Sequence, residues 1–270
     1  MTYFDNNGRC IPSAEMRVFA KDPSNYYKIN LKKINYEKSL TNLRSNGLIN
    51  GELKLNTFVE TLESIIDEIE NNKKYKNLLN GVKFPFAILN KCNNEDIGLN
   101  LENFLLPKLK NSFTTNYPDC HFKAILQSDS KLKGQLNFYE NSGMKELYNY
   151  SKKNLIIGWY FPQALQEFDI NSQRKQFALF DKLKKSKIAL SGGIDTVSAM
   201  IADPEMLINE NHYSPILCMS SYVHNDPRLV LLLKNYGPHL EFWLMTQMLT
   251  KTTTQVSEQW TGGITIYNNL

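Results

Sequence analysis

The segment SGGIDT, residues 191–196, is the part of this chain whose residue types and spacing best suit chemistry. An apolar stretch typical of a strand precedes it, and a stretch typical of a helix follows it. Backbone N–H groups of adjacent glycines at the start of a helix bind anions such as phosphate. A serine on the same kind of turn presents its hydroxyl as a nucleophile. A third interpretation is structural: Gly192 and Gly193 turn the chain, and Asp195 or Thr196 caps the next helix.

The first of these interpretations is supported by a resemblance. The strand, turn and helix around SGGIDT resemble the loop of the PP-loop ATP pyrophosphatases, whose signature is SGGxD[ST]. The resemblance implies a nucleotide-dependent enzyme that uses ATP and Mg²⁺, with the amides and hydroxyls of the turn facing a pyrophosphate. The ligand-binding candidates are then Ser191, Gly192, Gly193, Asp195 and Thr196. In the family the loop follows the first strand, whereas several expected strands precede it here.

A serine hydrolase is the second enzyme class that this turn allows. Ser191 would be the nucleophile, and an acid and then a histidine have to follow it along the chain. Asp226, or Asp203 in its place, and His239 are the catalytic candidates in that order.

The cysteines and histidines form no motif for a metal or a disulfide framework. Cys10, Cys92, Cys120 and Cys218 are far apart and contain no CxxC pair. Two cysteines have a histidine nearby in the sequence that could serve as a base for a cysteine nucleophile. In a strand, Cys120 and its neighbour His121 would point to opposite faces, and Cys218 would need a hairpin to reach His224. We therefore expect no metal site and no cofactor, with ATP–Mg²⁺ only under the pyrophosphatase alternative.

Charge and hydropathy favour neither nucleic acid nor membrane as a partner. The net charge is +4, and residues 188–270 contain only three Lys and Arg against seven Asp and Glu. A nucleic-acid binder normally concentrates its cations on one face. No apolar run approaches the ~20 residues of a membrane span, and the chain does not begin with an apolar signal core. We expect a soluble protein in the cytoplasm of the producing cell, with export from that cell left open.

The clearest predicted element is an amphipathic helix over residues 57–79. Thr57 and Glu60 have the spacing of a capping box at its start, and Gly81 stands where the helix should stop. Its apolar stripe consists of Leu55, Phe58, Val59, Leu62, Ile65, Ile66 and Ile69. The helix belongs to an N-terminal irregular and helical region, residues 1–82, that packs on a main domain of residues 83–270.

The pattern from about residue 84 predicts an α/β to α+β fold with a mixed sheet. Short apolar runs alternate with helical ones, as in largely parallel βα units. Ligands of such sheets bind beyond the carboxyl ends of strands, where the polar residues are Asn90, Cys92, residues 127–130 and Gln163. Residues 214–250 favour an antiparallel C-terminal meander. The alternatives are a continued parallel sheet and a buried helix that begins at Asp226.

These features predict a binding or interaction protein whose partner is a protein. The heavy use of Asn, Lys and Ile is typical of AT-rich genomes, and suggests an accessory or host-directed factor of such a microbe. The alternatives are the two enzymes described above, a PP-loop-like ATP pyrophosphatase and, with weaker support, a serine hydrolase. The location of Ser191, in a pocket or beneath the last strands, separates these hypotheses.

Overall fold

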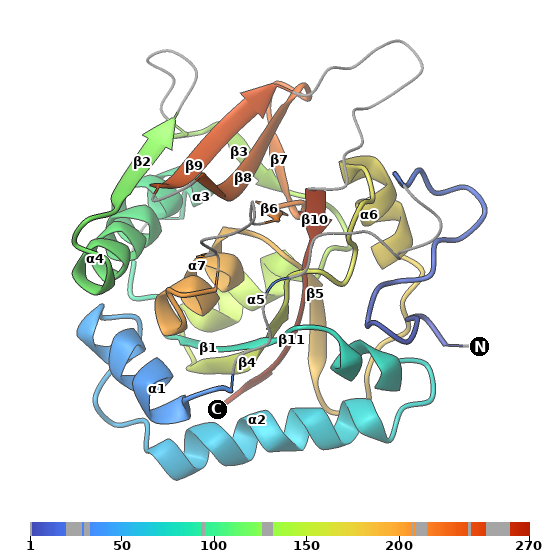
Figure 1. The fold of residues 1–270 in the computed structure, drawn as a ribbon, viewed down its shortest axis with the longest axis horizontal. Helices are drawn as coiled ribbons and strands as arrows, with labels where there is room; N and C mark the ends of the chain where they lie inside the picture. Colours follow the sequence, from blue (N-terminus) through green and yellow to red (C-terminus); the bar gives the residue numbers. More distant parts are fainter. Residues whose placement is uncertain are drawn as a thin grey trace.

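Four apolar segments form a central antiparallel sheet in the strand order β1-β4-β11-β5 (Figure 1). The strands are β1 (Phe84–Ile88), β4 (Ile156–Phe161), β5 (Lys187–Leu190) and β11 (Ile264–Asn269). Every residue of β1 and β4 is buried, because helices cover both faces of this sheet. The computed structural model describes residues 2–19, 29, 33–92, 95–125, 132–206, 208, 215–236, 239–246 and 260–270.

Two helices cover the faces of the central sheet. On one face lies α2, where the indole N–H of Trp159 donates to the carbonyl of Leu62 at 2.9 Å. On the other face lies α7, all of whose residues are buried. The helices are α1 (Tyr36–Ser45), α2 (Leu55–Glu70), the 3-10 helix η2 (Lys76–Asn80), α3 (Ile97–Asn100), the π-helix η3 (Leu101–Leu105), α4 (Leu106–Asn116), α5 (Met144–Ser151), α6 (Ile170–Phe177) and α7 (Gly193–Ala202).

A second, five-stranded sheet has the order β10-β6-β8-β9-β2 and mixes parallel with antiparallel pairs. The strands β8 and β9 form an antiparallel hairpin, and this part of the chain confirms the predicted meander. The two residues of its turn, 237–238, lie outside the described residues. The remaining strands are β2 (His121–Ile125), β3 (Leu136–Phe138), β6 (Ile216–Cys218), β7 (Tyr222–His224), β8 (Leu229–Tyr236), β9 (His239–Thr246) and β10 (Trp260–Gly262), with β3 and β7 paired as a separate ribbon.

The α+β class with a mixed sheet is confirmed, but parallel pairing occurs at other places than the βα alternation predicts. The strands β1, β4 and β5 belong to an antiparallel sheet, because β11 inserts between β4 and β5 and β1 runs against β4. The parallel pairs are β2 with β9 and β10 with β6, in the second sheet. Apolar periodicity reports which residues are buried, but it contains no information on strand direction.

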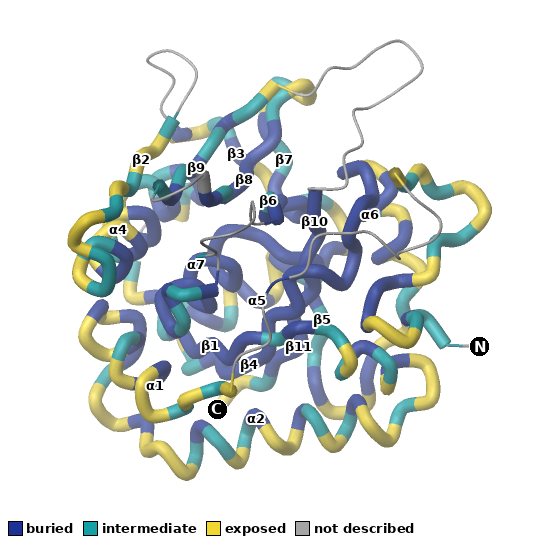
Figure 2. Tube along the Cα trace, in the orientation of Figure 1, coloured by how far each residue is buried: buried dark blue, intermediate teal, exposed yellow. Residues whose placement is uncertain are grey.

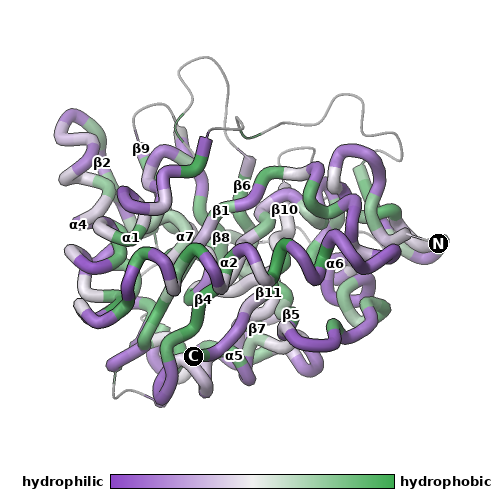
Figure 3. The backbone as a smooth tube through the Cα atoms, turned by 90° about the horizontal axis from the view of Figure 1, so that it is seen from below, coloured by the Kyte–Doolittle hydropathy of each residue, from purple (hydrophilic) through white to green (hydrophobic). Residues whose placement is uncertain are grey.

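The predicted helix over residues 57–79 is divided into α2 and η2. The helix α2 begins after Lys54, which makes no side-chain capping bond, so the predicted capping box of Thr57 and Glu60 is not formed. Gly81 is the C-cap of the short helix η2, whereas the sequence predicted that it would end one long helix. Figure 2 shows that each turn of α2 has a buried side and an exposed side, and Figure 3 shows hydrophilic and hydrophobic residues in alternation along the same helix. The residues that α2 buries are Phe58, Leu62, Ile65 and Ile69.

One cluster of buried apolar residues extends from Phe4 to Tyr267 and includes residues of both sheets. The described helices before residue 82 share this core with the rest of the chain. None of the helices in the described ranges combines the length and the apolar character that crossing a lipid bilayer requires.

We expect Ile65→Asp to unfold the protein, because the side chain is fully buried between α2 and the sheet. An unpaired buried carboxylate costs several kcal/mol, roughly the whole stability of a small domain. Ile66→Asp is the matched control, since Ile66 lies at the edge of the core and is only partly buried. Urea denaturation followed by circular dichroism measures both variants, and equal losses of stability would contradict the packing described for α2.

Candidate functional site

The SGGIDT segment has the predicted strand–turn–helix arrangement and lies inside the core. The strand β5 ends at Leu190, α7 begins at Gly193, and every residue from 191 to 196 is buried. Gly192 is the N-cap, and the carboxylate of Asp195 accepts a hydrogen bond from its N–H at 2.8 Å. Asp195 therefore caps the helix, as the structural interpretation predicts, but from its third position rather than from the N-cap.

The backbone N–H groups that would bind a phosphate face side chains of the protein itself. Gly192 donates to Asp195. The hydroxyl of Tyr222 lies beside Gly193 and Ile194, whose backbone N–H groups lower its pKa, whereas burial raises the pKa more strongly. A Cβ atom at Gly193 would lie 2.9 Å from the Tyr222 ring, which shows how closely this ring covers the turn. The tyrosine hydroxyl thus occupies the position at the helix N-terminus where an anion would bind.

The hydroxyl of Ser191 serves as a link between three strands. It accepts a hydrogen bond from the N–H of Gly263 at 3.1 Å, and it donates to the carbonyl of Cys218 at 3.4 Å. Gly263 lies between β10 and β11, and Cys218 ends β6. The Ser191 side chain is fully buried, so a substrate has no described route to it.

The proposed triad partners of Ser191 lie elsewhere. Asp226 stands in the turn between β7 and β8, where Arg228 binds its carboxylate and holds its pKa at about 2. His239 lies on β9 and stacks on His121. Asp203 caps the end of α7 and accepts a hydrogen bond from the N–H of Glu205. Among the described residues, no hydrogen bond joins any of them to Ser191.

The structure also does not combine either candidate cysteine nucleophile with a histidine base. Cys218 lies on β6 and His224 on β7, which pair with different strands. Burial raises the pKa of the Cys218 thiol to about 12, so the reactive thiolate does not form near neutral pH. Cys120 is the residue before β2 and is half-buried next to an exposed His121.

Asp195 is the electrostatic centre of the buried turn. Burial raises its pKa to about 6, while the hydroxyl of Thr265, which donates to its carboxylate at 2.6 Å, and the backbone N–H groups of the turn oppose this shift. Thr196 lies beside the hydroxyl of Tyr160, whose own pKa burial also raises. A carboxylate enclosed by hydroxyl groups and amides in this way holds β11 to α7.

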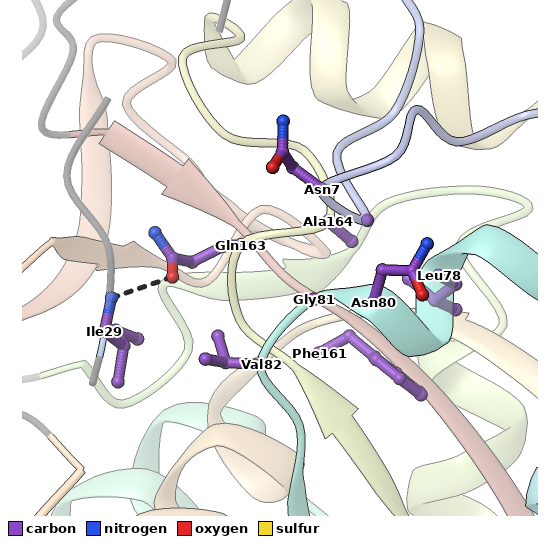
Figure 4. Close-up of a pocket in the computed structure, with 10 residues that line it drawn as sticks. Asn7, Ile29, Leu78, Asn80, Gly81, Val82, Phe161, Gln163 and Ala164 are labelled. Atoms are coloured by element: carbon purple, nitrogen blue, oxygen red, sulfur yellow. Dashed lines mark hydrogen bonds between the residues drawn. The ribbon is translucent and has the colours of Figure 1, made fainter. Parts of the chain in front are cut away.

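A small cavity lies beyond the end of β4, where Gln163 was expected to contact a ligand (Figure 4). Its volume is about 90 Å³, below the ~300 Å³ at which ligand sites commonly begin. Both ends of the Gln163 amide are used within the protein: it accepts from the N–H of Ile29 at 2.9 Å and donates to Gln166 at 2.8 Å. This cavity suits a few water molecules better than a metabolite.

Asn90, another polar residue expected after a strand, has a structural role. Asn90 is buried, and its carbonyl oxygen accepts hydrogen bonds from the side chain of Asn100 and from the N–H of Cys92. Residues 127–130, predicted in the same group, lie outside the described residues.

An open groove of about 490 Å³ lies between the end of α1 and the start of α4. In Figure 1 these two helices lie next to each other at one side of the molecule. The residues that line the groove are Ser45, Asn46, Gly47, Asn103, Phe104, Pro107, Lys108 and Asn111. Most of them are exposed to solvent, namely Ser45, Gly47, Asn103, Pro107 and Asn111.

A fixed cation lies in this groove. The ammonium group of Lys108 donates to the carbonyl of Asn46 at 2.7 Å and lies 4.7 Å from the ring centre of Phe104. Burial lowers the pKa of Lys108 from its ordinary value. Asn111 donates to the side chain of Asn46 at 2.8 Å, which fixes the turn after α1 against α4.

The groove wall contains the π-helix η3, and a proline in the sequence explains why this π-helix forms. Pro107 has no N–H to donate to the carbonyl of Asn103, and its ring would clash with that carbonyl in a regular α-helix. The wider turn of η3 immediately before α4 relieves this conflict. Such single π turns are frequent at functional sites. A proline within a helical pattern is therefore the sequence signal by which this groove could have been found.

Within the described ranges, no group of three or more His, Cys, Asp and Glu side chains gathers to hold a metal ion. All four cysteines are free.

We expect Asp195→Asn to change how stability depends on pH. A carboxyl whose pKa is raised on folding binds its proton more tightly in the folded protein, so stability is highest below about pH 4 and falls as the pH rises towards 6. The amide that replaces the carboxyl does not titrate, so the variant should gain about 3 kcal/mol relative to the parent protein between pH 4 and pH 7. Urea denaturation at both pH values measures this, and a stability difference that does not vary with pH would contradict the burial of the charge.

We expect ATP–Mg²⁺ to leave the melting temperature of the protein unchanged, because the turn is buried and the ring of Tyr222 covers it. Ser191→Ala should lower stability by about 1–3 kcal/mol, since the buried N–H of Gly263 loses its acceptor. Thermal denaturation of both proteins, with and without ATP–Mg²⁺, measures these effects. Stabilisation of the parent protein by ATP that Ser191→Ala abolishes would favour the pyrophosphatase hypothesis instead.

No protein-family model matches this sequence, and we found no curated protein and no solved structure that is similar to it.

Proposed function

We propose that this chain is a binding protein that holds an extended segment of a partner protein in the groove between α1 and α4. The observation that supports this proposal is the fixed cation of Lys108 between the Asn46 carbonyl and the Phe104 ring. A side chain already held in position loses little conformational entropy when a partner binds.

The open form of the groove favours a peptide over a small metabolite. Small-molecule sites enclose most of the ligand surface, whereas Ser45, Asn103 and Pro107 are exposed on the rims of this groove. A chain that lies along the groove would contact both walls without being enclosed. The volume of about 490 Å³ corresponds to a few residues of such a segment.

The lining predicts the chemistry of the bound segment. The side-chain amides of Asn103 and Asn111 suit hydrogen bonds to a peptide backbone, since an amide both donates and accepts. Phe104 and Pro107 offer an apolar contact to one side chain. Lys108 favours a carboxylate beside it, because a partly desolvated ammonium gains more from an anion than an exposed one does. We therefore propose an acidic segment with an apolar residue as the ligand.

The burial of Ser191 and of the amides of its turn is the reason why we prefer binding to catalysis as the function. Four free cysteines suit a reducing compartment. We accordingly propose that the partner is met in the cytoplasm, either of the producing cell or of a host cell after export.

Selection from a displayed library of random dodecapeptides tests the proposal. We expect the enriched peptides to share an Asp or Glu next to an apolar residue. Lys108→Ala and Phe104→Ala should each weaken their binding by about tenfold, the usual effect of losing one charge-assisted or aromatic contact. Fluorescence polarisation with labelled peptides measures the dissociation constants.

Lys110→Ala is the matched control, since Lys110 is an exposed lysine on the same helix and does not line the groove. It should leave binding unchanged. The proposal would be wrong if no peptide were enriched, or if the enriched peptides bound equally well to the parent protein and to both groove variants.

A further inference from the structure

Two histidines lie side by side at the open edge of the second sheet. The parallel pairing of β2 with β9 places His121 directly opposite His239. Their ring centres are 5.1 Å apart, and the ring planes are inclined by only 15°. His121 is exposed and His239 is half-buried, so solvent reaches the pair. This arrangement follows from strand register and was not visible in the sequence, where the two residues are far apart.

The nitrogen atoms of these two rings have no hydrogen-bond partner among the described residues. The charged neighbours on the same sheet face are already paired with other groups: Glu241 binds the indole N–H of Trp243 at 2.7 Å and the ammonium group of Lys234 at 3.5 Å. Lys123 stands opposite Glu241 on β2. Each imidazole therefore presents a lone pair that the described part of the chain does not use.

We infer that His121 and His239 form a two-imidazole site for a transition-metal ion of the Ni²⁺, Cu²⁺ or Zn²⁺ class. Neutral imidazole is the commonest protein ligand of these ions, at metal–nitrogen distances of about 2.0–2.1 Å. Two nitrogens bound to one ion are about 3 Å apart. Rings centred 5.1 Å apart are close enough for rotation of the side chains to bring one nitrogen of each to this separation. Water, or a group from a partner, completes the coordination.

A bound ion would join β2 to β9 through side chains in addition to the backbone ladder. The strand β2 is one of the two edge strands of the second sheet, and its residues are exposed or half-buried. The ion would therefore stabilise the folded state, and the stabilisation would rise with the logarithm of the ion concentration once this exceeds the dissociation constant. It would not be needed for folding, because the rest of the sheet does not depend on it.

Titration with NiCl₂ by isothermal calorimetry, together with the electron paramagnetic resonance spectrum of added Cu²⁺, tests this inference. We expect one Ni²⁺ ion per chain and a Cu²⁺ spectrum with coordination by two imidazole nitrogens. His121→Gln and His239→Gln should each weaken Ni²⁺ binding at least tenfold. Binding by the parent protein should also fall sharply from pH 7.5 to pH 5, because the ligands must be deprotonated.

Lys123→Ala is the control, since it changes the same face of β2 and retains both imidazoles; Cys120→Ser tests the neighbouring thiol in the same way. Both variants should bind Ni²⁺ as the parent protein does. Circular dichroism verifies that each variant is folded. The inference would be overturned if the parent protein did not bind Ni²⁺, or if the two histidine variants bound Ni²⁺ as tightly as the parent protein does.

Discussion

The position of the C-terminal strand β11 in the middle of the central sheet constrains most of this structure. Hydrogen bonds join β11 to β4 on one side and to β5 on the other, so the sheet is complete only when the last residues of the chain have docked. Gly263 takes the chain from β10 in the second sheet into β11 in the first. A Cβ atom at Gly263 would lie 2.4 Å from the ring of Tyr160, so no other residue fits at this crossing without displacing that ring.

The same crossing explains why the SGGIDT turn is buried. The N–H of Gly263 binds the hydroxyl of Ser191, and Thr265 on β11 binds Asp195. A turn of this sequence suits an anion site when its amides are open, and a buried connection when side chains of the protein fill their place. In this protein Tyr222 makes the turn a buried connection, because its hydroxyl lies against Gly193 and Ile194. Asp195 and Tyr222 thus perform within the protein what a bound anion would otherwise do for the helix N-terminus.

The elements that could be predicted from the sequence are those determined by neighbouring residues. The apolar stripe of α2, the boundary between β5 and α7 and the hairpin of β8 and β9 follow from local periodicity and turn chemistry. The insertion of β11 could not be predicted, because it depends on residues that are distant in the chain. The groove was missed for the same reason: Asn46 and Lys108 come from separate helices, and only the contact between them creates a site. Pro107 was the one local signal.

The two proposed sites share one segment of the chain and avoid the buried turn. The groove lies at the start of α4, and the strand β2 with His121 follows the end of that helix. Since η3 and α4 form a continuous helical segment packed against α7, the groove wall is a rigid element rather than a loop, and positioning on rigid elements favours defined binding geometry. Neither Lys108 nor His121 shares a hydrogen-bond partner with Asp195 or Ser191. The effects of substitutions at sites without shared partners are close to additive. Substitutions at the groove or at the histidine pair should therefore affect binding, whereas substitutions at the buried turn should affect the stability of the fold.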